Sequence, residues 1–173
     1  MNTHRQFVWD ILVRLTHWGV AAAVIANLFI TGRGDDDATH RVMGMIAAGL
    51  ILLRLLWALT FAKKPARLRD LIPTPGNACH HLQDLKRGED TAEPGHNAFG
   101  LLAVWAMWLC ILGLAFTGYH ANEYTALAKT YALDDWHEYL AKALMALVIL
   151  HISAVILTSW RVKRNLVRPM IHK

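Results

Sequence analysis

The chain has 173 residues, of which 55% are hydrophobic and only 18% are charged, and its mean hydropathy is +0.28. Soluble domains carry about 25% charged residues, so the composition excludes an ordinary water-soluble enzyme. The formal net charge is +5, and the two cysteines form no CxxC pair, which excludes a disulfide scaffold and a zinc ribbon. We therefore expect a small membrane protein with one domain over residues 1–173.

The first apolar segment follows a short polar start and predicts a helix over about 7–31. A helix needs roughly 20 residues to cross the hydrocarbon core of a membrane. A cleaved signal peptide also begins in this way, but Asp10 interrupts its basic region and no small-residue cleavage site follows Ile30. We therefore interpret the segment as the first span.

Three further apolar segments predict helices over about 40–62, 96–119 and 136–160. In lipid only helices and closed β-barrels satisfy their backbone hydrogen bonds, and four segments without alternation are too few for a barrel. The connection 63–95 contains four of the five prolines and is predicted to be irregular. The expected fold is all-α, an integral membrane four-helix bundle.

Basic residues are distributed unevenly between the two sides of this bundle. The N-terminal segment, the 63–95 connection and the tail after Trp160 contain thirteen lysines and arginines, whereas the other two connections contain three. The positive-inside rule then places both termini and the 63–95 connection in the cytoplasm. This topology, together with contact with anionic membrane lipid, explains the basic charge without a nucleic-acid partner.

Four histidines lie inside or at the ends of the predicted spans, where ionisable residues are costly and usually functional. His17 and His151 lie near the cytoplasmic ends of the first and fourth spans, and His40 and His137 lie at the outer ends of the second and fourth. The 14 residues between His137 and His151 make nearly four helical turns, so both share one face about 21 Å apart. The sequence thus predicts two pairs, His17 with His151 and His40 with His137.

Two such pairs fit few metal centres. A structural zinc site needs four ligands at one point, and a di-iron bundle needs several inward glutamates, of which the helices offer only Glu138. Imidazoles facing each other from two helices suit a planar macrocycle that is ligated on both sides. Bis-histidine ligation leaves haem iron no open position and favours electron transfer. For any single histidine, a polar contact with a neighbouring helix is the alternative.

Further residues are candidates for contact with such a group. Gly44 lies one turn from His40 and would let a macrocycle pack closely. Arg54 returns to the same face and could contact a haem propionate or a quinone, or its side chain could snorkel to the membrane surface. His120 could replace His40 as the outer ligand, and His96 could belong to the membrane interface or to a quinone site.

The chain resembles the bacterial cytochrome b561 and nickel–iron hydrogenase b-type cytochrome family. The resemblance lies in VWDILVRLTHW at 8–18, in HRVMG at 40–44 followed by Arg54 and Trp57 as an R-x-x-W motif, in GHNAFG at 95–100, and in WHE at 136–138 followed by His151. Within GHNAFG, Ala98 departs from the proline that the family often has there. It implies two haem b groups in the bacterial inner membrane, with His17 and His151 ligating the cytoplasmic-side haem and His40 and His137 the outer one. It also implies that quinone is a mobile substrate.

Three functions remain open at this point. The first is electron transfer between the quinone pool and a periplasmic c-type cytochrome or other redox protein; the second is a superoxide:quinone oxidoreductase; the third, a proton or ion transporter, lacks mid-membrane carboxylates. The outer connections contain three basic and six acidic residues, which would repel superoxide and attract a basic protein. The direction of electron flow, any enzymatic activity and the formation of a homodimer stay open.

Overall fold

The computed structural model describes residues 9–31, 37–72, 98–123, 129–163 and 165–171, and within these ranges it is helical, without strands. The long helices are α1 (Ile11–Phe29), α2 (Asp37–Thr60), α4 (Ala98–Glu123) and α6 (Leu133–Arg161), and short 3₁₀ turns lie at η2 (Leu68–Asp70) and η3 (Arg168–Met170). All four long helices are long and apolar enough to cross a membrane. The predicted all-α, four-span fold is therefore confirmed.

Local sequence sets the helix ends. The Asp10 carboxylate accepts a hydrogen bond from the Leu12 backbone N–H at 2.8 Å, so α1 begins at Ile11 rather than near residue 7. Helix α6 begins at Leu133, three residues before the expected start, after Ala132 in a left-handed conformation with φ 48°. Asp134 and Asp135 occupy its first turn, where negative charge stabilises the helix dipole.

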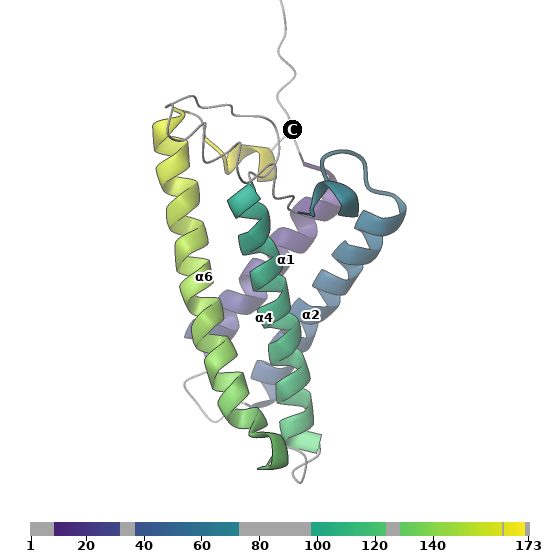
Figure 1. Ribbon diagram of the computed structural model, residues 1–173, viewed down its shortest axis with the longest axis vertical. Coiled ribbons are helices and arrows are strands. Elements are labelled where there is room, and N and C mark those ends of the chain that lie inside the picture. The colour runs from purple at the N-terminus through teal and green to yellow at the C-terminus, as the bar shows by residue number, and fades with distance from the viewer. Residues whose placement is uncertain (1–8, 32–36, 73–97, 124–128, 164, 172–173) are drawn as a thin grey trace, which may run out of the picture.

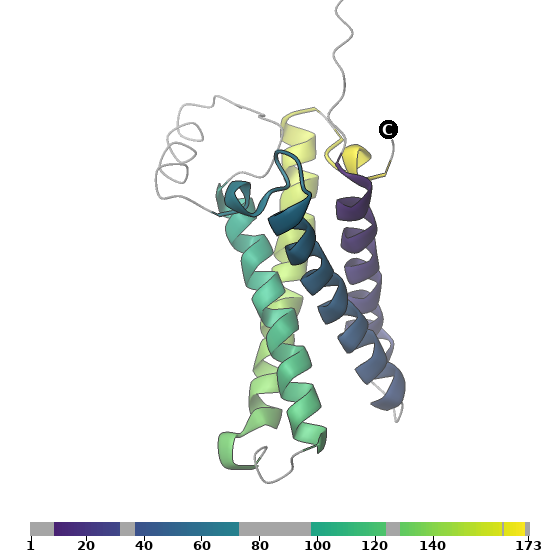
Figure 2. The ribbon, with the colours of Figure 1, turned by 90° about the vertical axis from the view of Figure 1, so that its right-hand side faces the viewer.

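The helices pack in the order α1, α2, α4, α6 (Figures 1 and 2). Among the described residues, α1 packs along α2, α2 along α4, and α4 along α6, whereas α6 packs closely along neither α1 nor α2. Leu144 is the one buried residue of α6. Most of the surface of α6 is therefore directed away from the helix core.

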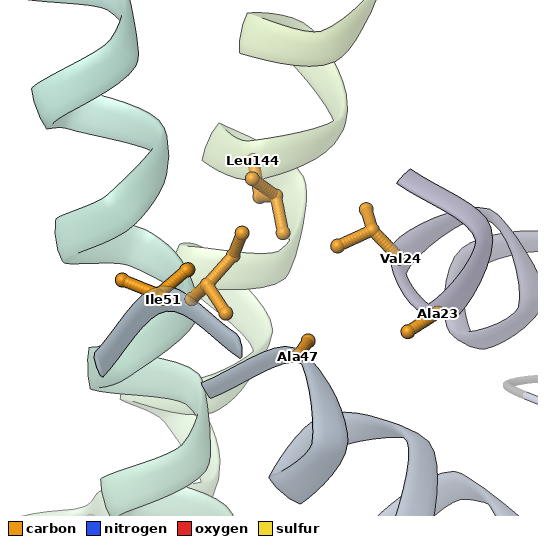
Figure 3. Packing of buried hydrophobic residues seen from close by; sticks show 6 residues of the cluster. Ala23, Val24, Ala47, Ile51 and Leu144 are labelled. Atoms are coloured by element: carbon orange, nitrogen blue, oxygen red, sulfur yellow. The ribbon is translucent and has the colours of Figure 1, made fainter. Parts of the chain in front are cut away.

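A small apolar layer holds the four helices together halfway along their length. Val24 of α1, Ala47 and Ile51 of α2, Ile111 of α4 and Leu144 of α6 are buried against one another (Figure 3). Small residues on α1 and α2 let these two helices approach closely. Leu144 lies midway along α6 between His137 and His151, so the layer separates the two ends of the bundle.

The beginning of α1 and the end of α6 lie at the same end of the bundle, which we call the proximal end; the other is the distal end. The Trp18 indole N–H donates to the Met170 carbonyl at 3.0 Å, and the Trp9 backbone N–H donates to the Pro169 carbonyl at 3.3 Å. Figure 2 shows the yellow C-terminal turn beside the purple start of α1. This placement agrees with an even number of spans.

Candidate functional site

His17 of α1 and His151 of α6 face each other at the proximal end. Their ring centroids are 6.4 Å apart, the ring planes are inclined at 58°, and both side chains are half-buried. The helices that carry them do not pack closely along each other. The structure therefore brings together the first pair of histidines that helix geometry predicts.

His40 of α2 and His137 of α6 form the corresponding pair at the distal end. Their ring centroids are 6.0 Å apart and the ring planes are inclined at 61°. This pair, too, bridges two helices without close backbone packing. Helix α6 thus contributes one histidine to each pair, and the apolar layer lies between the pairs.

The separation within each pair can be compared with known modes of imidazole contact. An imidazole nitrogen lies about 2 Å from a metal ion that it binds and about 1.2 Å from its ring centroid, so imidazoles on opposite sides of one metal have centroids about 6.4 Å apart. Two ligands at a tetrahedral angle, or two rings joined by a direct hydrogen bond, would give about 5 Å. The observed 6.4 and 6.0 Å leave room for ligation from opposite sides, and they also lie in the range of about 4.5–7 Å found for ordinary contacts between aromatic rings.

Hydroxyl groups orient both distal rings through their Nδ1 atoms. Thr117 Oγ1 lies 3.0 Å from His137 Nδ1 and gives its own proton to the Gly113 carbonyl at 2.9 Å. Thr31 Oγ1 lies 3.4 Å from His40 Nδ1 and donates to the Asn27 side-chain oxygen at 3.0 Å. We assign the ring proton of each histidine to Nδ1, so that each hydroxyl oxygen accepts from Nδ1–H and the Nε2 lone pair stays available for a metal.

Two glycines differ in what they contact. A Cβ built on Gly118 would lie 3.1 Å from the His137 ring, so the absence of a side chain makes room for that imidazole. A Cβ on Gly44 would meet the Asn27 amide nitrogen of α1 at 3.5 Å, an ordinary contact. The contact of Gly44 with a macrocycle, expected from the sequence, stays a prediction, and Gly118 is the glycine beside the His137 ring.

Arg54 is 6% exposed, and both of its terminal nitrogens donate to the Ala66 carbonyl, at 3.3 and 3.2 Å. The guanidinium therefore points into the protein at the proximal end and does not snorkel to the surface. Its contact with a propionate or a quinone stays a prediction. The Ala66 carbonyl, which accepts the hydrogen bonds from Arg54, belongs to the segment after α2, and the sequence predicts only that this segment is irregular.

Two buried donors at the proximal end were not anticipated from the sequence. The Nε atom of Arg14 and the indole Nε1 of Trp57 are buried without a hydrogen-bond acceptor. Arg14 precedes His17 by three residues and so lies on nearly the same face of α1, one turn closer to the proximal end. Buried donors are normally paired, so both are candidates to bind an acceptor group such as a carboxylate.

The other histidines do not form a third pair in the described part of the chain. His120 Nδ1 donates to the Phe116 carbonyl of its own helix at 3.0 Å, and its ring stacks on that of Phe116 with centroids 4.2 Å apart. The ring opposite His137 is that of His40. His96 lies outside the described residues, as do the acidic residues Asp35 and Asp36 of the first outer connection.

No group of three or more metal-binding side chains occurs among the described residues. Each histidine pair could supply at most two protein ligands, and a macrocycle would have to provide the remaining coordination. The residues present fit such a group, because both distal rings offer Nε2 and both pairs have the separation expected for ligation from opposite sides.

A family model described as prokaryotic cytochrome b561 matches residues 8–173. The match includes all four long helices and all four paired histidines. No curated protein and no solved structure matches the chain significantly.

Proposed function

Because the chain belongs to the prokaryotic cytochrome b561 family, we propose that it binds two haem b groups and transfers electrons between the quinone pool and a periplasmic redox protein. The family and the four apolar helices make it a multi-pass b-type cytochrome of the bacterial inner membrane. The observation that carries the proposal of two haems is the presence of two histidine pairs, each with the ring separation of two ligands across one metal ion.

We assign the four imidazoles as axial ligands, His17 with His151 at the proximal haem and His40 with His137 at the distal haem. Bound haem iron supplies one-electron oxidation and reduction. With a histidine on each side of the macrocycle, the iron would keep no open position for oxygen, so each pair would favour electron transfer. Thr117 and Thr31 hold the distal rings in one orientation and one tautomer, as partners of ligating histidines commonly do.

The apolar layer around Ala47, Ile51 and Leu144 separates the two sites. His137 and His151 are about 21 Å apart along α6, so the two sites lie near opposite membrane surfaces. A layer without charged side chains opposes the passage of ions, because ions are strongly destabilised in such surroundings. This arrangement supports electron transfer over the transport of protons or other ions.

We place the proximal end in the cytoplasm, since basic residues concentrate there. The distal end would then face the periplasm, where it exposes Asp134 and Asp135, whereas the nearby Glu138 is ion-paired with Lys142. Exposed carboxylates suit a basic protein partner such as a c-type cytochrome, because oppositely charged surfaces guide the encounter. Quinol or oxidised quinone, dissolved in the lipid, would exchange electrons with the proximal haem site.

The number of haems tests the proposal directly. We expect a reduced-minus-oxidised spectrum of the purified chain to show a b-type cytochrome, and haem extracted as the pyridine complex to amount to two per chain. One haem per chain in fully loaded protein would contradict the assignment of both pairs. A preparation without haem from haem-replete cells would contradict the whole proposal.

The association of the distal end with a basic c-type cytochrome should slow as salt is added. Screening weakens attraction between exposed charges beyond about 8 Å at physiological ionic strength. We expect the second-order rate to fall several-fold between low and physiological salt. The Asp134→Asn, Asp135→Asn double variant should start slower and depend less on salt. An association rate that does not change with ionic strength in stopped-flow measurements would contradict an acidic docking surface.

A superoxide:quinone oxidoreductase is the second candidate, and it rests on exposed Arg41 and Lys129 at the distal end. These cations could attract superoxide locally although acidic residues outnumber basic ones in the outer connections. Stopped-flow mixing of the oxidised protein with superoxide and, separately, with quinol distinguishes the candidates. Fast haem reduction by superoxide that slows in Arg41→Gln and Lys129→Gln would favour this second function.

A further inference from the structure

An open groove of about 420 Å³ lies at the proximal end between the last turns of α6 and the segment that follows it. Val155, Ile156 and Val167 line its apolar side, and Lys163 and Asn165 line its polar side. None of the paired histidines lines it, although Val155 and Ser159 lie one and two turns beyond His151 on the same face of α6. Its combination of an apolar floor with a lysine and an amide at one edge suits a ligand that has an apolar tail and a polar head.

The local backbone forms this groove. Lys163 has a left-handed conformation with φ 50°, which turns the chain away from the axis of α6. Asn165 Oδ1 then accepts hydrogen bonds from the backbone N–H groups of Val167 at 2.9 Å and Arg168 at 3.1 Å. Ser159 Oγ accepts from the Leu166 N–H at 3.3 Å, which joins the segment to the last turn of α6.

The same segment joins α6 to α1. Beyond the groove, the carbonyls of Pro169 and Met170 accept hydrogen bonds from Trp9 and Trp18, and Met170 packs against the cluster that contains Trp9. Helices α1 and α6 have no close packing along their lengths, yet they carry the two rings of the proximal pair. Residues 162–163 and 165–171, which we call the C-terminal strap, thus connect the end of α6 to the beginning of α1.

The position and charge of the groove identify the class of ligand. Trp160, 82% exposed at the end of a membrane span, has the place of an interfacial tryptophan, so the groove lies at the height of the lipid headgroups. No acidic residue follows Glu138 in the sequence, whereas five basic residues follow Trp160: Arg161, Lys163, Arg164, Arg168 and Lys173. The ligand head should therefore be an anion.

Two polar side chains of the groove, Lys163 and Asn165, offer hydrogen-bond donors to a ligand. Because two backbone N–H groups occupy the side-chain oxygen of Asn165, the free polar group of this residue is its NH₂. The Lys163 ammonium is exposed and carries three N–H donors. A phosphate diester could accept from both residues, whereas the head of a quinone would leave the lysine without a counter-ion.

We propose that this groove binds one phospholipid with an anionic headgroup. Its phosphate contacts Lys163 and Asn165, and one acyl chain lies along Val155, Ile156 and Val167. The bound lipid holds the C-terminal strap against α6, and the strap in turn holds α6 near α1. Anionic lipid thereby stabilises the proximal end, in addition to the general attraction of the basic residues to the membrane surface.

The test uses the full-length purified chain, stripped of lipid in neutral detergent and supplied with phosphatidylglycerol or phosphatidylcholine of identical acyl chains. We expect native mass spectrometry to detect one retained phosphatidylglycerol and no retained phosphatidylcholine. Lys163→Gln should weaken phosphatidylglycerol binding about five-fold, the factor that corresponds to about 1 kcal/mol per lysine near an anionic surface. Lys129→Gln, an exposed lysine at the distal end, is the matched control and should bind as the unmodified chain does.

Amide hydrogen exchange provides a second readout that does not depend on haem. Phosphatidylglycerol should slow exchange at Leu166, Val167 and Arg168 in the unmodified chain, and less so in Lys163→Gln. Equal retention of both lipids, or unchanged binding in Lys163→Gln, would overturn the proposal. Displacement of the lipid by millimolar inorganic phosphate alone would overturn it too, because the site would then be a phosphate site.

Discussion

Replacement of His151 by alanine is expected to remove one of the two haems from each chain and to leave the other in place. His151 faces His17, and no group of three or more possible metal ligands occurs among the described residues, so a replacement for its imidazole is not expected. Losing one of two axial ligands leaves an iron with an open position and a weakly held macrocycle. Haem extracted as the pyridine complex should fall from two per chain to about one.

The matched controls distinguish loss of a ligand from loss of the fold. His120→Ala removes a histidine that bonds to its own helix and should leave both haems bound. His17→Ala should lose the same spectral component as His151→Ala, and the double variant should lose nothing further, because both residues serve one site. If His151→Ala kept two haems, or if His17→Ala and His151→Ala removed different components, the proximal assignment would be wrong.

The sequence predicts the four spans and the histidine pairs because both follow from properties of single helices. Apolar length determines whether a segment can cross the membrane, and the 14-residue spacing of His137 and His151 determines that both share one face of α6. Depth then pairs them with His40 and His17. None of these steps requires knowledge of how one helix is rotated against its neighbour.

What the sequence does not predict depends on that rotation. Thr117 contacts His137 only because α4 turns this residue toward α6, and nothing in the local pattern distinguishes it from other helical threonines. Gly118 lies beside the His137 ring for the same reason, and its position in the sequence gives no sign of this contact. Packing between helices determines which neighbour a helix face contacts. The helical period and the depth of a residue in the membrane do not determine this.

The partners of Arg54 and Arg14 illustrate a second limit. The carbonyl that accepts from Arg54 lies in an irregular segment, whose path no helical period predicts. The unpaired Nε of Arg14 becomes visible only when every neighbouring acceptor is known. The depth of a charged residue in the sequence indicates that it lies near a cofactor site, but its hydrogen-bond partners can be identified only from the structure.

Replacement of Thr117 by valine should weaken the distal haem selectively. Valine has nearly the shape of threonine but accepts no hydrogen bond, so His137 Nδ1–H would lose the oxygen that lies 3.0 Å away. Loss of such a partner typically lowers metal affinity about 10–100-fold, because the imidazole becomes less basic and less firmly oriented. Since a less basic ligand stabilises ferric iron less, the midpoint potential of the distal haem should also rise.

A haem-transfer assay to apomyoglobin measures the first effect, and a redox titration measures the second. His137→Ala identifies which spectral component belongs to the distal haem, so the change can be assigned to one site. Thr60→Val is the matched control, because the Thr60 hydroxyl bonds to the Leu56 carbonyl of its own helix on an exposed face. A Thr117→Val protein whose distal component kept its affinity and its potential would show that the hydroxyl does not support the ligand. A change confined to the proximal component would instead contradict the pairing of His137 with His40, since Thr117 touches only the distal ring in the described part of the chain.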